Sequence, residues 1–250
     1  MHSEPKTTAS LPADAVHLSA LPRDELVRMA EAGGEIVGVR DILGKTGDNV
    51  VAEILRNQGT FYEWDHYPSG DVYDHGSHAQ YYYHAHPVAQ RFEGEHGHFH
   101  TFLRPKGMPA GIRPAPIPGA PEPEDPNDAL SHLIAISMDP DGEPFRMFTV
   151  NRWVTGEVWY RAEDVCRLLD LFRIDHAQPS WPTNRWITAM IALFKPQIRE
   201  LVAARDRCLA AWQADGPEAD AYEDRDLEVT SYVDISVDRQ LEAIRALLDA

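Results

Sequence analysis

Histidines are concentrated in one part of this sequence. Eight of the twelve histidines lie within 35 residues, where an even distribution would place fewer than two. Imidazole is the commonest metal ligand near neutral pH, so this density indicates a bound transition metal. The eight residues are His66, His75, His78, His84, His86, His96, His98 and His100.

Two segments within this cluster alternate histidine with other residues. His84 and His86 form an H-x-H string, and His96, His98 and His100 form an H-x-H-x-H string. In a strand, residues i, i+2 and i+4 share a face. If both segments are strands, each string therefore presents its imidazoles to one side of a sheet.

The nine residues between the two strings have the length of a long hairpin connection. An antiparallel pairing with His86 near His96 would place His84 near His98, with opposed Cβ atoms roughly 4.5–5.5 Å apart. Four imidazoles would then lie within reach of one ion, since metal–nitrogen bonds are roughly 2.0–2.1 Å long. We predict these four residues as ligands, and His100, one step beyond the centre, as a further metal-binding candidate.

A carboxylate lies beside the second string. Glu95 directly precedes His96, and Glu93 lies in the connection. Two histidines plus a carboxylate form the facial triad of non-haem Fe(II) oxygenases, which leaves positions open for oxygen and substrate. Iron is therefore the favoured ion, although three or four histidines would suit zinc or copper equally. Glu95 is predicted as a fourth ligand or a general base.

Two further residues are candidates for contact with a small-molecule substrate. Tyr82 shares the predicted strand face of His84 and would line a pocket, or pack as an ordinary strand aromatic. Arg152 could hold a substrate carboxylate, or pair in the interior with one of the many acidic residues. With Glu95, these two residues are the predicted catalytic set. The outlying histidines are assigned to the periphery of the site: His66, His75 and His78.

Several accounts of the cluster remain open. The protein is either a metal-dependent enzyme, most simply an iron oxidoreductase, or a non-catalytic metal or haem binding protein such as a sensor, carrier or storage protein. Closed coordination without a pocket would favour the second class, and an open position beside a pocket would favour the first. Without any metal, the histidines would only titrate in solvent or would be core residues satisfied by hydrogen bonds.

The composition limits the classes of partner. The 250 residues are 43% apolar and 25% charged, as in ordinary globular proteins, and their net charge is −17. Nucleic acids and anionic membranes attract positive charge, so neither is an expected partner. No nucleotide-binding glycine loop, G-x-S-x-G or H-E-x-x-H string occurs. An oligomer remains open.

The location is inferred from what the sequence lacks. No apolar run approaches the roughly 20 residues of a membrane-spanning helix, and no signal-peptide pattern is visible at the N-terminus. Cys166 and Cys208 both lie in predicted helices, so a disulfide framework is not indicated. We expect a cytoplasmic protein.

Alternation and turn signals predict the sheet that positions the histidines. Residues 60–103 are rich in Tyr, Phe, His and Gly and are predicted to form strands. Eight prolines make residues 104–128 a long extended loop, either a surface connection or, as a sharper alternative, a flap over a site. Further strands are predicted at 132–138, 145–150, 153–160 and 228–235.

Helical periodicity predicts helices on both sides of this sheet. The first begins at about Leu21 and stops at Gly33-Gly34. A longer one over 184–212 should kink at Pro196, and a short C-terminal helix is capped by Ser236. Other helices are predicted at 35–43, 49–57 and 162–172.

These elements predict an α+β fold. Its antiparallel sheet or partly closed β-barrel would be flanked by N-terminal and C-terminal helices. Residues 1–18 are predicted as a flexible tail, and residues 19–250 as a single α+β metal-binding domain.

Three strings of this chain resemble an uncharacterised bacterial family of unknown function. They are HYPSGDVYDHGSHAQYYYHAHP (66–87), EGEHGHFHTFLRP (93–105) and FTVNRWVTGEVWY (148–160). The resemblance implies a shared fold unit but no activity. The H-x-H string is also similar to the cupin ligand string. Cupins follow it with a glutamate and a later histidine, whereas here a second H-x-H-x-H follows, so the likeness implies a cupin-like site geometry.

Overall fold

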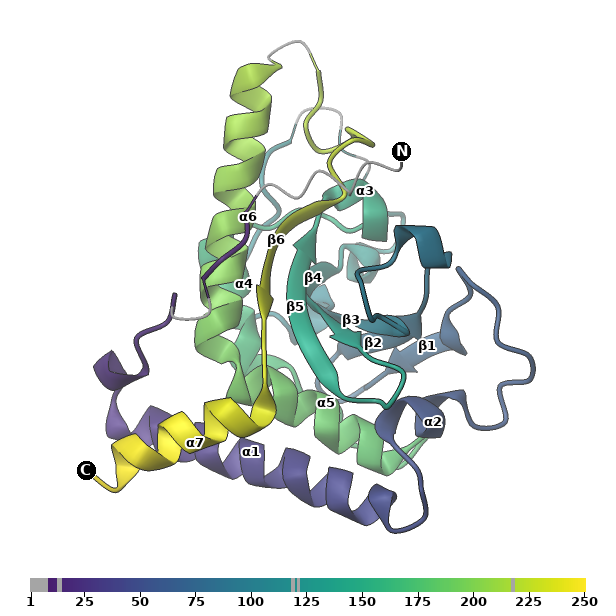
Figure 1. The fold of residues 1–250 in the computed structure, drawn as a ribbon. Coiled ribbons are helices and arrows are strands. Elements are labelled where there is room, and N and C mark those ends of the chain that lie inside the picture. Colours follow the sequence, from purple (N-terminus) through teal and green to yellow (C-terminus); the bar gives the residue numbers. More distant parts are fainter. Residues whose placement is uncertain (1–8, 13–14, 118–119, 121, 217–218) are drawn as a thin grey trace.

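A six-stranded antiparallel sheet forms the centre of the molecule (Figure 1). The computed structural model describes residues 9–12, 15–117, 120, 122–216 and 219–250. The sheet curls without closing, because β1 and β6 lie at its two edges. The strands, which follow one another in chain order, are β1 (Tyr67–Tyr73), β2 (Ala79–His84), β3 (Gly97–Leu103), β4 (Ser131–Met138), β5 (Pro144–Val150) and β6 (Val229–Asp234).

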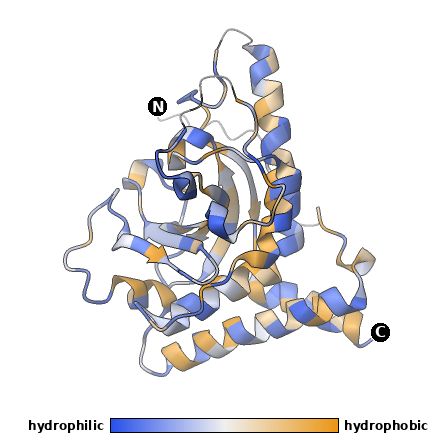
Figure 2. Cartoon of the chain, turned by 180° about the vertical axis from the view of Figure 1, so that it is seen from behind, coloured by the Kyte–Doolittle hydropathy of each residue, from blue (hydrophilic) through white to orange (hydrophobic). Residues whose placement is uncertain are grey.

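Helices cover one face of this sheet and confirm the predicted α+β class. Helices α5 and α6 share a hydrophobic core with the strands, in which Trp186 of α5 lies 5.4 Å from Phe99 of β3 between ring centroids. Seen from behind, α6 alternates apolar and polar residues (Figure 2). The helices are α1 (Arg23–Gly44), α2 (Val50–Leu55), α3 (Arg152–Thr155), α4 (Ala162–Leu168), α5 (Trp181–Leu193), α6 (Lys195–Asp215) and α7 (Val237–Leu248).

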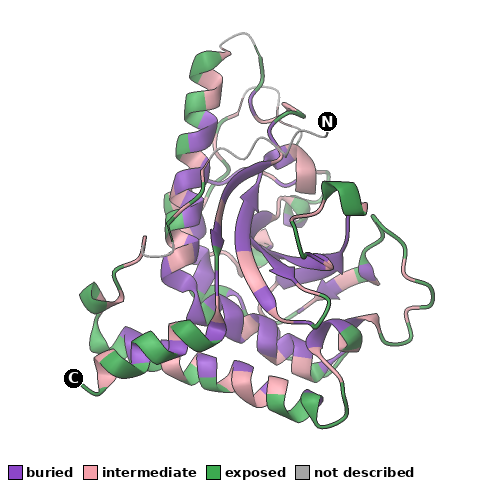
Figure 3. Cartoon of the chain, viewed as in Figure 1, coloured by how far each residue is buried: buried purple, intermediate pink, exposed green. Residues whose placement is uncertain are grey.

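The two faces of the sheet differ in chemistry. Tyr81, Tyr83 and Phe99 belong to the helix-covered core. Alternate positions point the other way, and there β2 and β3 pair Tyr82 with His100 and His84 with His98. Strands β2 and β3 are buried over their whole length (Figure 3), so the curl of the sheet encloses these polar side chains as well.

The strand predicted over residues 153–160 is wrong. Asn151 caps the short helix α3 by accepting a hydrogen bond from the Arg152 amide, and Gly156 ends this helix in the left-handed conformation at φ 64°. Residues 157–160 belong to no strand or helix. The composition of this segment favours a strand, but the helix caps at Asn151 and Gly156 determine its structure.

The predicted helix end at Gly33-Gly34 is also wrong, because α1 continues to Gly44. A Cβ at Gly33 would lie 2.7 Å from Cγ of Leu241 in α7. This glycine permits close contact between α1 and α7, which lie side by side at the base of Figure 1. The predicted cap of Ser236 on α7 is confirmed, and Asn49, the first residue of the predicted helix 49–57, caps α2.

The long C-terminal helix is interrupted rather than kinked. Helix α5 ends at Leu193, and Pro196 lies in the first turn of α6, where its missing N–H leaves no hydrogen bond unmade. At the other end of the chain, part of the predicted flexible tail pairs with β6, since the Leu11 amide donates to the Tyr232 carbonyl at 2.9 Å. Residues 1–8 lie outside the described part.

Candidate metal centre

Three buried imidazoles converge on the face of the sheet that the helices do not cover. His84 ends β2, His86 lies two residues beyond it, and His98 lies in β3. Their candidate ligand nitrogens all lie within 4.8 Å of one another. The register that opposes His84 to His98 is the predicted one.

The spacing of this triad is close to that of a ligand set. His84 and His98 share a hydrogen bond of 2.7 Å between their Nε2 atoms. The ring centroid of His86 lies 5.0 Å from that of His84 and 5.1 Å from that of His98. A tetrahedral ion with bonds of roughly 2.0–2.1 Å holds its ligand atoms about 3.3 Å apart. Separating the hydrogen-bonded pair by about half an ångström would therefore admit an ion.

Carboxylates lie behind two of the three rings. Oε1 of Glu95 is 3.2 Å from Nδ1 of His98, and Oε1 of Glu228 is 3.5 Å from Nδ1 of His86. A carboxylate that accepts from Nδ1–H leaves Nε2 unprotonated and directs it toward a metal. Glu95 is thus an outer partner of a candidate ligand and does not belong to the group of ligating atoms.

Burial favours the neutral form of His84 and His86, which is the form that binds metals. Desolvation and the neighbouring His98 lower the pKa of His86 to about 4, and the same causes lower the pKa of His84 well below its usual range. Burial alone would raise the pKa of Glu95, but the charge and hydrogen bond of His98 lower it overall. Burial raises the pKa of Glu228.

A small cavity opens beside the triad. Its volume is about 20 Å³, which holds one water-sized molecule. His86 and His98 line it together with Glu95, Glu228 and the ring of Phe148. A metal bound to the triad would therefore have room for one small additional ligand.

His100 lies one step from the triad. It is fully buried, and its Nδ1 shares a hydrogen bond of 3.0 Å with Nε2 of His132. Its Nε2 has no hydrogen-bond partner among the described residues. His100 lines the 20 Å³ cavity, so it faces the space in which a metal-bound molecule would lie, although it is not part of the converging group.

His96 lies apart from the other predicted ligands. Its Nδ1 shares a 2.6 Å hydrogen bond with the hydroxyl of Tyr83, a residue of the helix-covered core. Strand β3 begins at Gly97, so the alternation on which the prediction relied does not extend to His96. A Cβ at Gly97 would lie 2.6 Å from the Tyr83 hydroxyl, and this close approach allows the contact.

The structure separates Tyr82 from Arg152. Tyr82 lies beside the triad, with its ring centroid 5.3 Å from that of His84. Arg152 forms an ion pair with Glu223, and no hydrogen bond or ion pair between described residues joins it to the triad. The alternative of a buried arginine paired with an acidic residue therefore describes Arg152.

The outlying histidines differ in their distance from the centre. His66 stacks on Tyr82 at 3.6 Å between ring centroids and lies 5.7 Å from His84 in an edge contact. His75 and His78 instead contact Tyr73 near the turn between β1 and β2, as their peripheral assignment predicts.

Sequence reasoning missed two residues at the centre. Glu228 is 142 positions from His86, and no local pattern links them. Trp64 stacks on His86 at 4.4 Å between ring centroids while remaining 54% exposed. It has a φ of 73°, a conformation that bulky residues rarely adopt, so its position over His86 is held by tertiary contacts.

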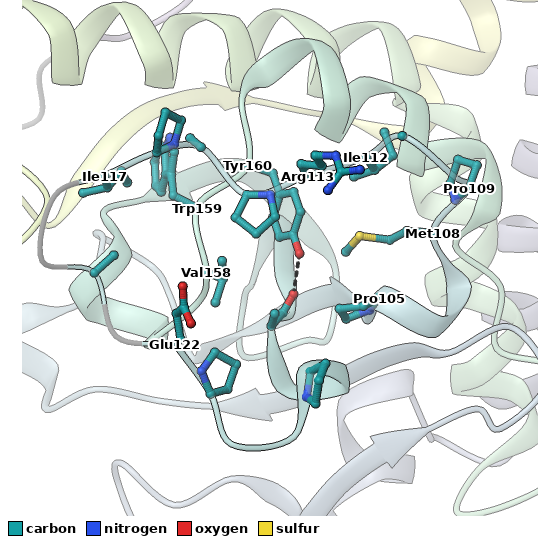
Figure 4. Close-up of a pocket in the computed structure, with 18 of the residues that line it drawn as sticks. Pro105, Met108, Pro109, Ile112, Arg113, Ile117, Glu122, Val158, Trp159 and Tyr160 are labelled. Atoms are coloured by element: carbon teal, nitrogen blue, oxygen red, sulfur yellow. Dashed lines mark hydrogen bonds between the residues drawn. The ribbon is translucent and has the colours of Figure 1, made fainter.

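The proline-rich loop forms a separate pocket of about 680 Å³ (Figure 4). Met108, Ile112 and Trp159 contribute to a mainly apolar lining, in which Tyr160 donates a hydrogen bond to the Ala129 carbonyl. None of the histidines of the triad lines this pocket. The described part of the loop lines this pocket and not the cavity beside the triad.

Comparison with known proteins assigns a family. The family described as a domain of unknown function, DUF6969, matches residues 30–235. The chain belongs to this family. The match includes the triad, both outer carboxylates and all six strands. No curated protein and no solved structure matches the chain.

Among the described residues, none of the helices combines the length and apolar character needed to cross a bilayer.

Proposed function

We propose that this member of DUF6969 is a metal-dependent enzyme in which His84, His86 and His98 hold one transition-metal ion. The observation that carries the proposal is the convergence of three buried imidazoles whose ligand nitrogens lie within 4.8 Å of one another. Burial of polar groups costs free energy that apolar side chains would not. Glu95 and Glu228 lie near Nδ1 of His98 and His86, as carboxylates that orient metal-binding imidazoles do.

The donor set narrows the choice of ion. Three neutral imidazoles suit iron, copper or zinc. Iron and an oxidation reaction are our finer proposal, because three protein ligands leave coordination positions open on an octahedral ion, and the cavity beside the triad has room for one small ligand. Zinc with three histidines, which would acidify a bound water for hydrolysis, is the competing assignment.

The surroundings of the triad favour catalysis over storage. A bound metal would supply Lewis acidity or oxygen binding at the water-sized cavity. Glu95, whose pKa is lowered by His98, lines this cavity and can accept a proton there. Haem is a poor candidate, because ligands of that size occupy pockets of hundreds of cubic ångströms and this cavity measures about 20 Å³.

Elemental analysis tests the metal site. Protein purified without a histidine tag should contain about one transition-metal ion per chain, and His84→Ala and His98→Ala should lose it. His96→Gln is the matched control, since it changes a half-buried histidine on the opposite face whose ring contacts Tyr83 and Phe61. Circular dichroism verifies that each variant is folded.

Two results would overturn the assignment. The first is substoichiometric metal that does not change in His84→Ala and His98→Ala. The second is loss of metal in His96→Gln with retention in the other two variants.

A further inference from the structure

A second, polar pocket adjoins the triad. It has a volume of about 660 Å³, within the range of small-molecule sites. Its walls come from the loop before β1, from β1 itself and from the neighbouring strand β2. The lining residues used below are Tyr62, Asp65, His66, Asp71, Gln80 and Arg104.

An irregularity of β1 creates one wall of this pocket. Tyr67 pairs with Tyr83 and Val72 with Tyr81, so four residues of β1 bulge out where β2 contributes one. Gly70 and Asp71 adopt left-handed backbone conformations in this bulge, with φ of 86° and 61°. Bulges next to active sites re-aim side chains, and this one directs the Asp71 carboxylate toward His66 and Gln80.

Consecutive hydrogen bonds link the polar side chains of this wall. Arg104 donates to Gln80 at 2.6 Å, and Gln80 donates to Asp71 at 2.6 Å. The second oxygen of Asp71 lies 3.0 Å from Nδ1 of His66. The wall is therefore ordered before any ligand binds, which lowers the entropic cost of binding.

The charges of the lining disfavour an ionic ligand. Two carboxylates, Asp65 and Asp71, oppose an anion, and the protein carries a net charge of −17. Against a cation, the Arg104 guanidinium offsets part of this negative charge although it is also paired with Asp128, and both oxygens of Asp71 are already engaged. What remains is a dense mixture of hydrogen-bond donors and acceptors. Hydroxyl groups match such a mixture, because each one both donates and accepts.

An exposed aromatic ring adds an apolar surface at the rim. Tyr62 is 61% exposed although it lines the pocket. The Tyr67 hydroxyl accepts a 2.6 Å hydrogen bond from the Tyr62 amide and so fixes the backbone of this loop. An aromatic face beside hydrogen-bonding groups suits a sugar ring, which is apolar on its C–H face and polar around its edge.

The pocket is in contact with the metal centre through one side chain. His66 lines the pocket, stacks on Tyr82 and makes an edge contact with His84 of the triad. A molecule in the pocket therefore lies one ring away from the candidate ligands.

We propose that this pocket binds a neutral polyhydroxylated molecule of the size of a monosaccharide. Its assignment as the substrate of the metal centre rests on the function proposed above, whereas its binding to the pocket does not. The hydroxyl groups bind Asp65 beside the ordered wall of Asp71 and Gln80, and the C–H face of the ring lies on Tyr62.

Ligand-observed NMR tests the pocket directly. Saturation transfer is measured from the full-length protein to D-glucose, D-galactose, D-mannose and myo-inositol, with choline and citrate as cationic and anionic controls. We expect transfer to at least one neutral polyol and none to the two ions. Tyr62→Ala and Asp65→Asn should weaken this binding at least tenfold. Trp181→Ala, which removes another aromatic ring that is 54% exposed, should leave it unchanged.

Measurements with and without metal separate the two proposals. Polyol binding that persists in protein treated with a chelator supports the pocket even if the triad binds no metal. Absence of transfer to all four polyols, or transfer that Tyr62→Ala and Asp65→Asn leave intact, overturns the pocket assignment whatever the metal content. Stronger binding of choline or citrate than of the polyols would also overturn it.

Discussion

At the scale of single residues, the carboxylates behind the imidazoles determine which ring nitrogen faces the centre. Glu95 and Glu228 each lie near an Nδ1 atom, and this leaves the Nε2 atoms of His98 and His86 directed inward. Orientation of this kind changes metal affinity without changing the number of ligands. The two glutamates should therefore affect binding strength, while the histidines should determine whether binding occurs.

Removal of one outer charge tests this division of roles. We expect Glu228→Gln to weaken metal binding roughly 10–100-fold, the usual effect of losing an outer partner, with the stoichiometry at saturation unchanged. Competition with a chromophoric chelator measures the affinity. Glu223→Gln is the control, because Glu223 is paired with Arg152 away from the triad. Equal affinities of Glu228→Gln and the wild type would show that Glu228 does not orient His86.

At the scale of elements, strand alternation predicts the centre only as far as each strand extends. His84 and His98 were predicted as neighbours and are paired across β2 and β3. His96 lies one residue before β3, where alternation no longer applies, and it turns to the other face. Strand boundaries depend on partners in the sheet that a single sequence does not specify, so this error could not be avoided from the pattern alone.

Helix α1 illustrates a second limit. A glycine pair usually ends a helix, because glycine gains freedom outside it. Here Gly33 lies inside α1 and faces Leu241 of α7, so tertiary packing determines its role. The sequence contains the contact partner, but 208 positions away from the glycine.

Two glycine substitutions in this one helix should have opposite effects. Gly33→Ala should destabilise the protein by about 1–3 kcal/mol, because its methyl group would overlap the buried Leu241 side chain. Gly38→Ala should stabilise it by up to about 1 kcal/mol, because no atom lies within 4 Å of the added Cβ and alanine favours a helix. Urea unfolding measures both. A stabilising Gly33→Ala would contradict the close packing of α1 on α7.

At the scale of the whole molecule, the curl of the sheet brings together residues that are far apart in the chain. The strands follow chain order, yet Glu228, directly before β6, reaches His86, directly beyond β2. The α+β class and a partly closed sheet could be predicted from alternation and helical periodicity. Which distant residues the curl brings together could not, because this depends on how side chains pack on both faces. Glu228 was for this reason absent from the predicted site.

An acidic residue is also buried next to β4. Glu157 is 1% exposed, and its Oε2 accepts a 2.7 Å hydrogen bond from the amide of His132. Burial raises the pKa of Glu157 to about 8, although the charges of Arg205 and Arg152 act against this shift. The folded protein therefore keeps a proton on Glu157 at pH values at which the unfolded chain has lost it.

This proton should make stability fall as pH rises. Between the unfolded pKa of 4.5 and the folded value of about 8, the folded state binds one more proton than the unfolded state, so each unit of pH lowers the free energy of unfolding. Glu157→Gln carries no such proton, and glutamine can still accept the hydrogen bond from His132. We expect the stability of the variant relative to wild type to increase by roughly 2–3 kcal/mol from pH 6 to pH 9. Urea unfolding at both pH values measures this difference, with the exposed Glu242→Gln as the control. If the difference between Glu157→Gln and wild type stayed constant, or shrank as pH rose, Glu157 would be ionised in the folded protein, and the curled sheet would not enclose it from solvent as described.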